Sequence, residues 1–146
     1  MLRAFLLLAA LTMYVVMPSL TWALRIAHIE GFEAGMAKVL VLPMWLRIVS
    51  VVTAGVVEDT LFVAYAFTRL TLLTENQWLA GTVTVLVFSF LHLSNWGVGP
   101  VLTYFVAIAI STAFFAWRRD LLANIVAHVV VDGMGIVVMP WLSRVH

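Results

Sequence analysis

Long apolar runs separated by short polar stretches dominate this sequence. The runs cover residues 4–24, 39–70, 78–93, 98–117 and 121–142. A helix needs about 20 mostly apolar residues to cross the hydrocarbon core of a bilayer. The second run is longer than one untilted span, so it is either one tilted helix or two pieces. The pattern predicts an all-α fold, a polytopic membrane helical bundle of about five to six transmembrane helices.

The polar stretches divide the chain. Residues 25–38 hold charged side chains and two glycines, and are interpreted as a polar connection or a short interfacial helix. We therefore expect two parts, a first transmembrane helix with its connection over residues 1–38 and a membrane core over residues 39–142. The first run exceeds the roughly 7–15 residues of a signal-peptide core, which favours an uncleaved span. A turn is expected at residues 70–77, and the short joint at residues 94–97 predicts antiparallel neighbours.

The composition agrees with a membrane protein and excludes several classes of function. Hydrophobic residues make up 64% of the 146 residues and charged residues 10%, against about 25% charged in soluble domains. The net charge of +1 comes with scattered basic residues, so nucleic acid is excluded as a partner. Cysteine is absent, which rules out disulfides, thiolate metal ligands and a cysteine nucleophile.

Five ionisable residues lie well inside the apolar runs: Glu58, Asp59, His92, His128 and Asp132. A charge at the bilayer centre costs at least about 2.5–3.5 kcal/mol on insertion scales, so such residues indicate function. Counted from the nearest predicted turn at about 1.5 Å per residue, four of them lie roughly 12–21 Å deep on three separate helices, namely Glu58, His92, His128 and Asp132. The shared depth predicts one polar site.

Helical spacing adds further polar groups to this set. Asn124, His128 and Asp132 follow one another at intervals of four and form a stripe on one helix face, and Phe88 lies one turn before His92. We expect Asn124 and Phe88 to support the site. The alternative is a helix-packing seam held together by Asn and His hydrogen bonds.

The buried residues suit hydrolysis of an acyl bond without a covalent nucleophile. A carboxylate and a histidine from different helices can together take a proton from water, which then attacks a carbonyl. A second histidine, with a side-chain oxygen or nitrogen, can stabilise the oxyanion that forms. Glu58 is the only glutamate within a predicted span, so it is the best candidate for the base.

The order of these residues resembles the CPBP family (CAAX protease and bacteriocin-processing) of glutamic intramembrane proteases, which includes the Rce1-like prenyl-protein endopeptidases. The motifs of that family are EExxxR, FxxxH, and HxxxN or HxxxD, in that order. They are matched over residues 39–142 by the following residues: Glu58 with Asp59, Phe88 with His92, and His128 with Asp132. Two departures are Asp59 in place of the second glutamate and Val63 in place of the arginine.

The resemblance implies an endopeptidase that needs no metal or other cofactor. Glu58 would then be the general base acting on water and His92 its partner, while His128 and Asp132 would form the oxyanion side. Asp59 lacks a cation within reach along its own helix. We therefore expect it to be protonated or hydrogen-bonded to polar groups of a neighbouring helix, and to matter less than Glu58.

The resemblance also implies a substrate that is a membrane protein or a lipid-linked protein, cleaved at a prenylated tail, a leader peptide or a carboxy-terminal sorting helix. The short chain indicates a multi-pass protein of the cytoplasmic membrane of a prokaryote. Two other interpretations stay open. One is a non-catalytic CPBP-like scaffold or immunity protein, favoured by the missing arginine. The other is a metal or proton carrier, in which the histidines and acids could ligate Zn²⁺ through nitrogen and oxygen.

Overall fold

The amino-terminal part of the chain forms one long helix and one short one. The computed structural model describes residues 2–29 and 33–143, and all elements within those ranges are helical. The long helix runs through α1 (Leu2–Leu11), the π-helical segment η1 (Thr12–Val16) and α2 (Met17–Ile26). The short α3 (Glu33–Leu40) occupies the end of the predicted polar connection, whose residues 30–32 lie outside the described ranges.

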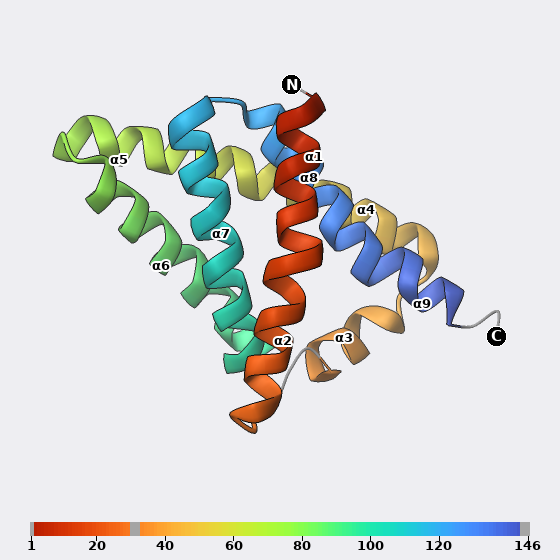
Figure 1. Ribbon diagram of the computed structural model, residues 1–146. Coiled ribbons are helices and arrows are strands. Elements are labelled where there is room, and N and C mark those ends of the chain that lie inside the picture. The colour runs from red at the N-terminus through yellow and green to blue at the C-terminus, as the bar shows by residue number, and fades with distance from the viewer. Residues whose placement is uncertain (1, 30–32, 144–146) are drawn as a thin grey trace.

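The next apolar run forms a single tilted helix. It comprises α4 (Met44–Glu58), the π-helical segment η2 (Asp59–Ala66) and α5 (Phe67–Thr74), 31 residues in all. Its length of about 46 Å exceeds the ~30 Å hydrocarbon core, so it crosses at an angle. Figure 1 shows it strongly inclined to α1 and α2. The helix begins after Pro43, whose extended ψ of 148° separates it from α3.

Three further apolar runs complete the bundle. They form α6 (Gln77–Trp96), α7 (Val98–Arg118) and a last helix made of α8 (Leu121–Gly133), η3 (Met134–Val138) and α9 (Met139–Leu142). The Asn76 side chain starts α6 by accepting hydrogen bonds from the backbone N–H groups of Trp78 and Leu79. Asp120 starts α8 by accepting one from Ala123.

Two predicted boundaries need correction. The helix expected to turn at residue 70 continues to Thr74, so the turn is only Glu75 and Asn76. The joint expected at residues 94–97 is the single residue Gly97, because α6 continues through Trp96. Gly97 has a φ of 86°, which glycine adopts without strain. The predicted antiparallel arrangement of α6 and α7 is confirmed (Figure 1).

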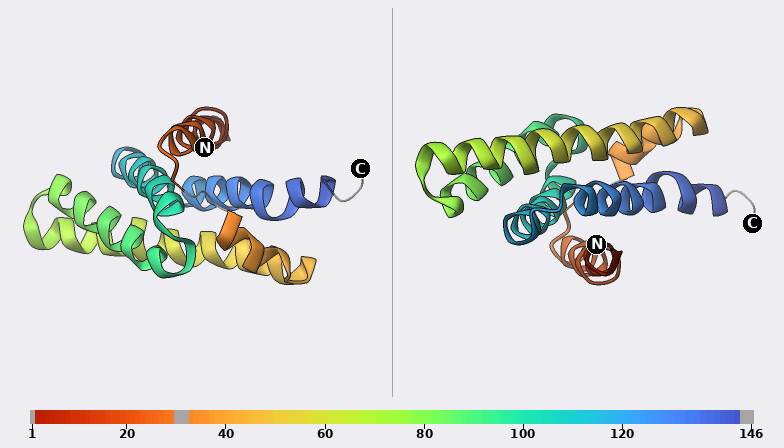
Figure 2. Two further views of the ribbon diagram at one scale, coloured as in Figure 1. Left: turned by 90° about the horizontal axis from the view of Figure 1, so that it is seen from below. Right: turned by 90° about the horizontal axis from the view of Figure 1, so that it is seen from above.

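Within the described residues, five helices are long and apolar enough to cross a membrane. The predicted all-α membrane bundle is thereby confirmed, and the chain is an integral, multi-pass membrane protein. Figure 2 shows the α4–α5 helix running beside α8 and α9, with α1 and α2 on the other side of α8. The main apolar core lies between η2, α5, α6 and α7 and includes the fully buried Val63.

Candidate active site

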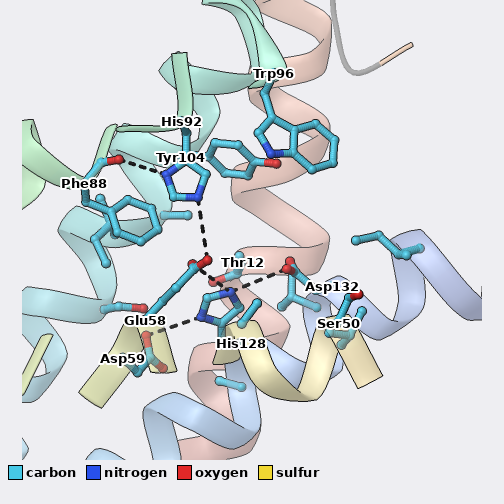
Figure 3. Close-up of a pocket in the computed structure, with 18 of the residues that line it drawn as sticks. Thr12, Ser50, Glu58, Asp59, Phe88, His92, Trp96, Tyr104, His128 and Asp132 are labelled. Atoms are coloured by element: carbon cyan, nitrogen blue, oxygen red, sulfur yellow. Dashed lines mark hydrogen bonds and ion pairs between the residues drawn. The ribbon is translucent and has the colours of Figure 1, made fainter. Parts of the chain in front are cut away.

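A cavity of about 210 Å³ lies where the middle of the long α4–α5 helix meets α6, α7 and α8. The structure brings into its wall all five ionisable residues that the sequence suggested for a site: Glu58, Asp59, His92, His128 and Asp132 (Figure 3). Phe88 also lines the cavity. Groups separated by up to 74 positions in the sequence therefore share one small volume inside the membrane bundle.

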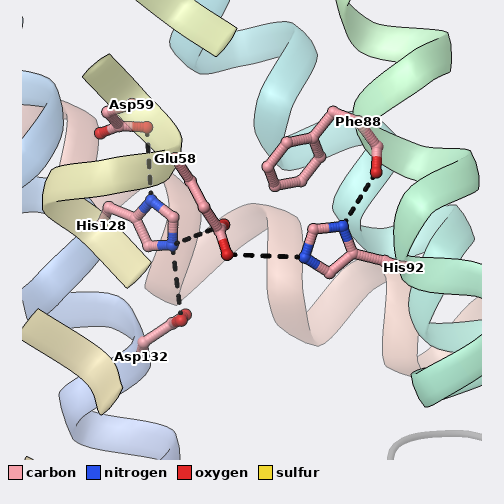
Figure 4. Close-up of polar contacts among 6 residues, drawn as sticks. All are labelled: Glu58, Asp59, Phe88, His92, His128 and Asp132. Carbon is pink, nitrogen blue, oxygen red and sulfur yellow. Dashed lines mark hydrogen bonds and ion pairs between the residues drawn. The ribbon is translucent and has the colours of Figure 1, made fainter. Parts of the chain in front are cut away.

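Glu58 and His92 face each other across the cavity (Figure 4). Oε1 of Glu58 lies 3.7 Å from Nε2 of His92. The other ring nitrogen, Nδ1, lies 2.8 Å from the backbone oxygen of Phe88, and a carbonyl oxygen can only accept a hydrogen bond. Nδ1 therefore carries a proton, and Nε2 is the ring nitrogen that faces Glu58.

Aromatic rings hold the imidazole of His92 in this orientation. The Phe88 ring lies 4.4 Å from it, centroid to centroid, at an angle of 30°. On the other side the Tyr104 ring lies at 5.1 Å, and Trp96 in turn packs edge-on against Tyr104 (Figure 3). Phe88 thus contacts His92 through both its ring and its carbonyl group. The two aromatic contacts and the hydrogen bond together restrict rotation of the imidazole.

His128 lies among three carboxylates (Figure 4). Its Nδ1 is 3.3 Å from Oδ1 of Asp59, while its Nε2 is 3.4 Å from Oδ2 of Asp132 and 3.9 Å from Oε2 of Glu58. Only the doubly protonated ring can donate on both sides. Through these contacts His128 connects α8 to the junction of α4 and η2.

Asp59 is fully buried, with an exposed fraction of 0%. Its contact with His128 of α8 confirms the expectation that it hydrogen-bonds to a neighbouring helix. Arg47 does not reach it, because that buried guanidinium donates instead to the backbone oxygen of Ile136 at 3.2 Å. The acid is therefore held by a histidine at its own depth in the bundle.

Asn124, expected to support the site, does not line the cavity. It is fully buried, and its Nδ2 donates to the backbone oxygen of Ser111 in α7 at 3.0 Å. Residues four apart differ in direction by about 40° around a helix axis, so the side chains of Asn124 and Asp132 point in directions about 80° apart. Asn124 therefore makes the helix-packing contact that was the alternative for this stripe.

The geometry agrees with a comparison to known protein families. The family described as type II CAAX prenyl endopeptidase, Rce1-like, matches residues 40–134. This range covers about two thirds of the chain and contains the whole set of ionisable residues in the cavity. This protein belongs to the Rce1-like family. No curated protein and no solved structure matches the chain.

In this Rce1-like chain, the position of the arginine in the EExxxR motif lies in an apolar environment. Val63, at the arginine position, is fully buried and packs in the apolar core with Phe67 and Phe88. A cation there would be surrounded by apolar side chains and costly to bury. Asp59, which lacks this arginine, contacts His128 in its place.

The sequence interpretation missed four hydroxyl-bearing residues in the cavity wall, namely Thr12, Ser50, Tyr104 and Ser111. Tyr104 could have been found, since antiparallel helices joined at Gly97 put positions at similar distances from that joint at similar depth. Tyr104 follows Gly97 by seven residues, and His92 precedes Gly97 by five residues. Thr12 carried no such signal, because the packing of the first helix on α8 and α7 brings it to the cavity.

Proposed function

We propose that this protein is an intramembrane endopeptidase of the glutamic type, in which Glu58 and His92 activate a water molecule. The observation that carries the proposal is the 3.7 Å separation of Oε1 of Glu58 and Nε2 of His92. The distance exceeds that of a direct hydrogen bond, and in the resting state that we propose His92 is neutral, so that both atoms accept protons. One water molecule can donate to both, so it would be polarised and oriented at once.

The reaction that we propose balances with these groups alone. The water oxygen attacks the scissile carbonyl carbon while its proton passes to the Glu58–His92 pair. His128, in its doubly protonated form, donates from Nε2 to the oxyanion, and Asp59 orients the ring through Nδ1. The C–N bond then breaks, and the amine nitrogen takes up the proton. Asp132 belongs to the oxyanion side through His128, because its Oδ2 lies 3.4 Å from Nε2 and stabilises the charged ring.

The cavity also suits a substrate that comes from the membrane. Apart from the ionisable cluster, its wall is mostly apolar and includes Leu8, Val51 and Ile136. An extended peptide with aliphatic side chains, attached to a lipid or a membrane helix, could reach the acids from the bilayer. We propose a prenylated tail, a leader peptide or a sorting helix as substrate, and the cytoplasmic membrane of a prokaryote as the setting.

The proposal is tested by a proteomic comparison of membrane fractions from cells that produce the wild-type protein or Glu58→Ala. We expect one or more partners to be shorter in the wild type and full-length in the variant. The matched control is Glu75→Gln, which changes an exposed acid in the turn before α6. If the membrane proteins had the same chain termini in cells with the wild type and in cells with Glu58→Ala, the proposal of an endopeptidase would be rejected. The non-catalytic scaffold, which the buried Val63 at the arginine position favours, would then be preferred.

Chelation distinguishes water activation by Glu58 and His92 from chemistry at a metal. Among the described residues, no group of three or more His, Asp or Glu side chains is arranged to hold a metal ion. We therefore expect cleavage of an identified partner to proceed at the same rate in the presence of EDTA or phenanthroline. Loss of cleavage that returns on addition of Zn²⁺ would favour a metal-dependent enzyme or a metal carrier.

A further inference from the structure

A second hollow lies between α6 and α7, and it is lined by other residues of the pair than the catalytic cavity. It is a groove of about 590 Å³, within the range of small-molecule sites. Figure 1 shows the two helices meeting near Gly97 and diverging toward Gln77 and Arg118. Most of the groove lies in this divergent half, and it reaches Phe105, which is next to Tyr104 in the sequence but does not line the catalytic cavity.

The shape of the groove suits a single hydrocarbon chain. Its floor consists of small residues, among them Gly81, Ala109 and Ala113, and Phe105 forms part of its wall. From Phe105 to Trp117 it follows α7 for 12 residues, or about 18 Å. One leaflet of a bilayer provides about 15 Å of hydrocarbon depth, half of the ~30 Å core. The groove therefore matches an acyl chain within one leaflet better than a helix that crosses both.

The wide end of the groove has the chemistry of a lipid headgroup region. Trp78 and Trp117 line it and are 80% and 76% exposed, and tryptophan is enriched at membrane–water interfaces. The Arg118 guanidinium lies 5.1 Å from the Trp117 ring, and that of Arg119 lies 5.6 Å from the ring of Phe67, which also lines the groove. Within the described part of the chain, neither arginine is paired with a carboxylate.

We propose that this groove binds an anionic phospholipid, with one acyl chain between α6 and α7 and its phosphate at Arg118 and Arg119. The two unpaired cations complement the charge of the phosphate, and each contributes roughly 1 kcal/mol, or about fivefold in affinity, near a membrane surface. The site is separate from the proposed catalytic cavity. It can therefore be tested without any assay of cleavage.

The test measures lipid retention by native mass spectrometry on purified protein that has been exposed to phosphatidylglycerol or phosphatidylcholine. We expect the wild type to retain phosphatidylglycerol in preference. Arg118→Gln together with Arg119→Gln should lower that retention by at least about tenfold. The matched control is Arg25→Gln, which removes an exposed cation in the last turn of α2. That turn lies at the end of the bundle opposite to the end of α7 (Figure 1).

A second variant tests the groove itself and leaves both arginines intact. Ala113→Leu adds bulk at an exposed position of the floor, so it should fold normally and reduce retention of the phospholipid. Equal retention of the two lipids, or full retention of phosphatidylglycerol by either groove variant, would overturn the proposal. A dimer that Ala113→Leu converts to monomer would also overturn it, because the occupant would then be a second copy of the chain.

Discussion

The variant Glu58→Gln is expected to cleave substrate about 10²–10⁴-fold more slowly than the wild type, with little change in stability. Glutamine keeps the size and polarity of the side chain, but its amide cannot take a proton from water. The side chain is 25% exposed and lines the cavity, so the substitution does not disturb the apolar core. The measurement is the cleavage rate of a partner found by proteomics, together with the thermal midpoint of the purified variant.

Asp59→Asn supplies the matched comparison on the next residue. The asparagine can still accept a hydrogen bond from Nδ1 of His128, so the ring stays oriented while one negative charge is lost. We expect this variant to lose clearly less activity than Glu58→Gln. If the two variants were equally inactive at equal folded amounts, the two acids would act as one unit, and the assignment of Glu58 alone as the base would fail.

The variant His128→Ala is expected to lower kcat by about 10²–10³-fold and to change KM little. A donor to the oxyanion acts mainly in the transition state, so its loss appears in kcat rather than in binding of the substrate. His128 is suited to this function because its Nε2 lies 3.9 Å from Oε2 of Glu58, next to the proposed nucleophile. Steady-state kinetics on the same substrate separate the two parameters.

Loss of His128 also leaves the buried Asp59 without its histidine contact, which is expected to cost stability of about 1–3 kcal/mol. Asn124→Ala is the control for this effect, since it removes a buried hydrogen bond between α8 and α7 that is made by a side chain outside the cavity wall. It should lower the thermal midpoint while kcat per folded molecule stays within a few fold. A fall in kcat as large as that of His128→Ala would indicate that damage to α8, rather than loss of a donor, explains both variants.

The sequence by itself determined the helical membrane fold and the set of ionisable residues in the cavity. Apolar runs of sufficient length leave few alternatives, because every backbone polar group within a bilayer must be satisfied by a helix or a closed barrel. The residues Glu58, His92 and His128 stood out for a related reason, since ionisable groups in lipid are costly. Counting positions from the turns then sufficed to predict that they lie at a common depth.

Only the tertiary structure decided which side chains face one another. Depth follows from position along a helix, but direction depends on rotation about the helix axis and on crossing angles, which the sequence pattern leaves open. For this reason Asn124 turned out to contact α7 rather than the cavity, and Thr12 of the first helix joined the wall. The contact of Asp59 with His128 likewise depends on how η2 packs against α8, 69 positions further along the chain.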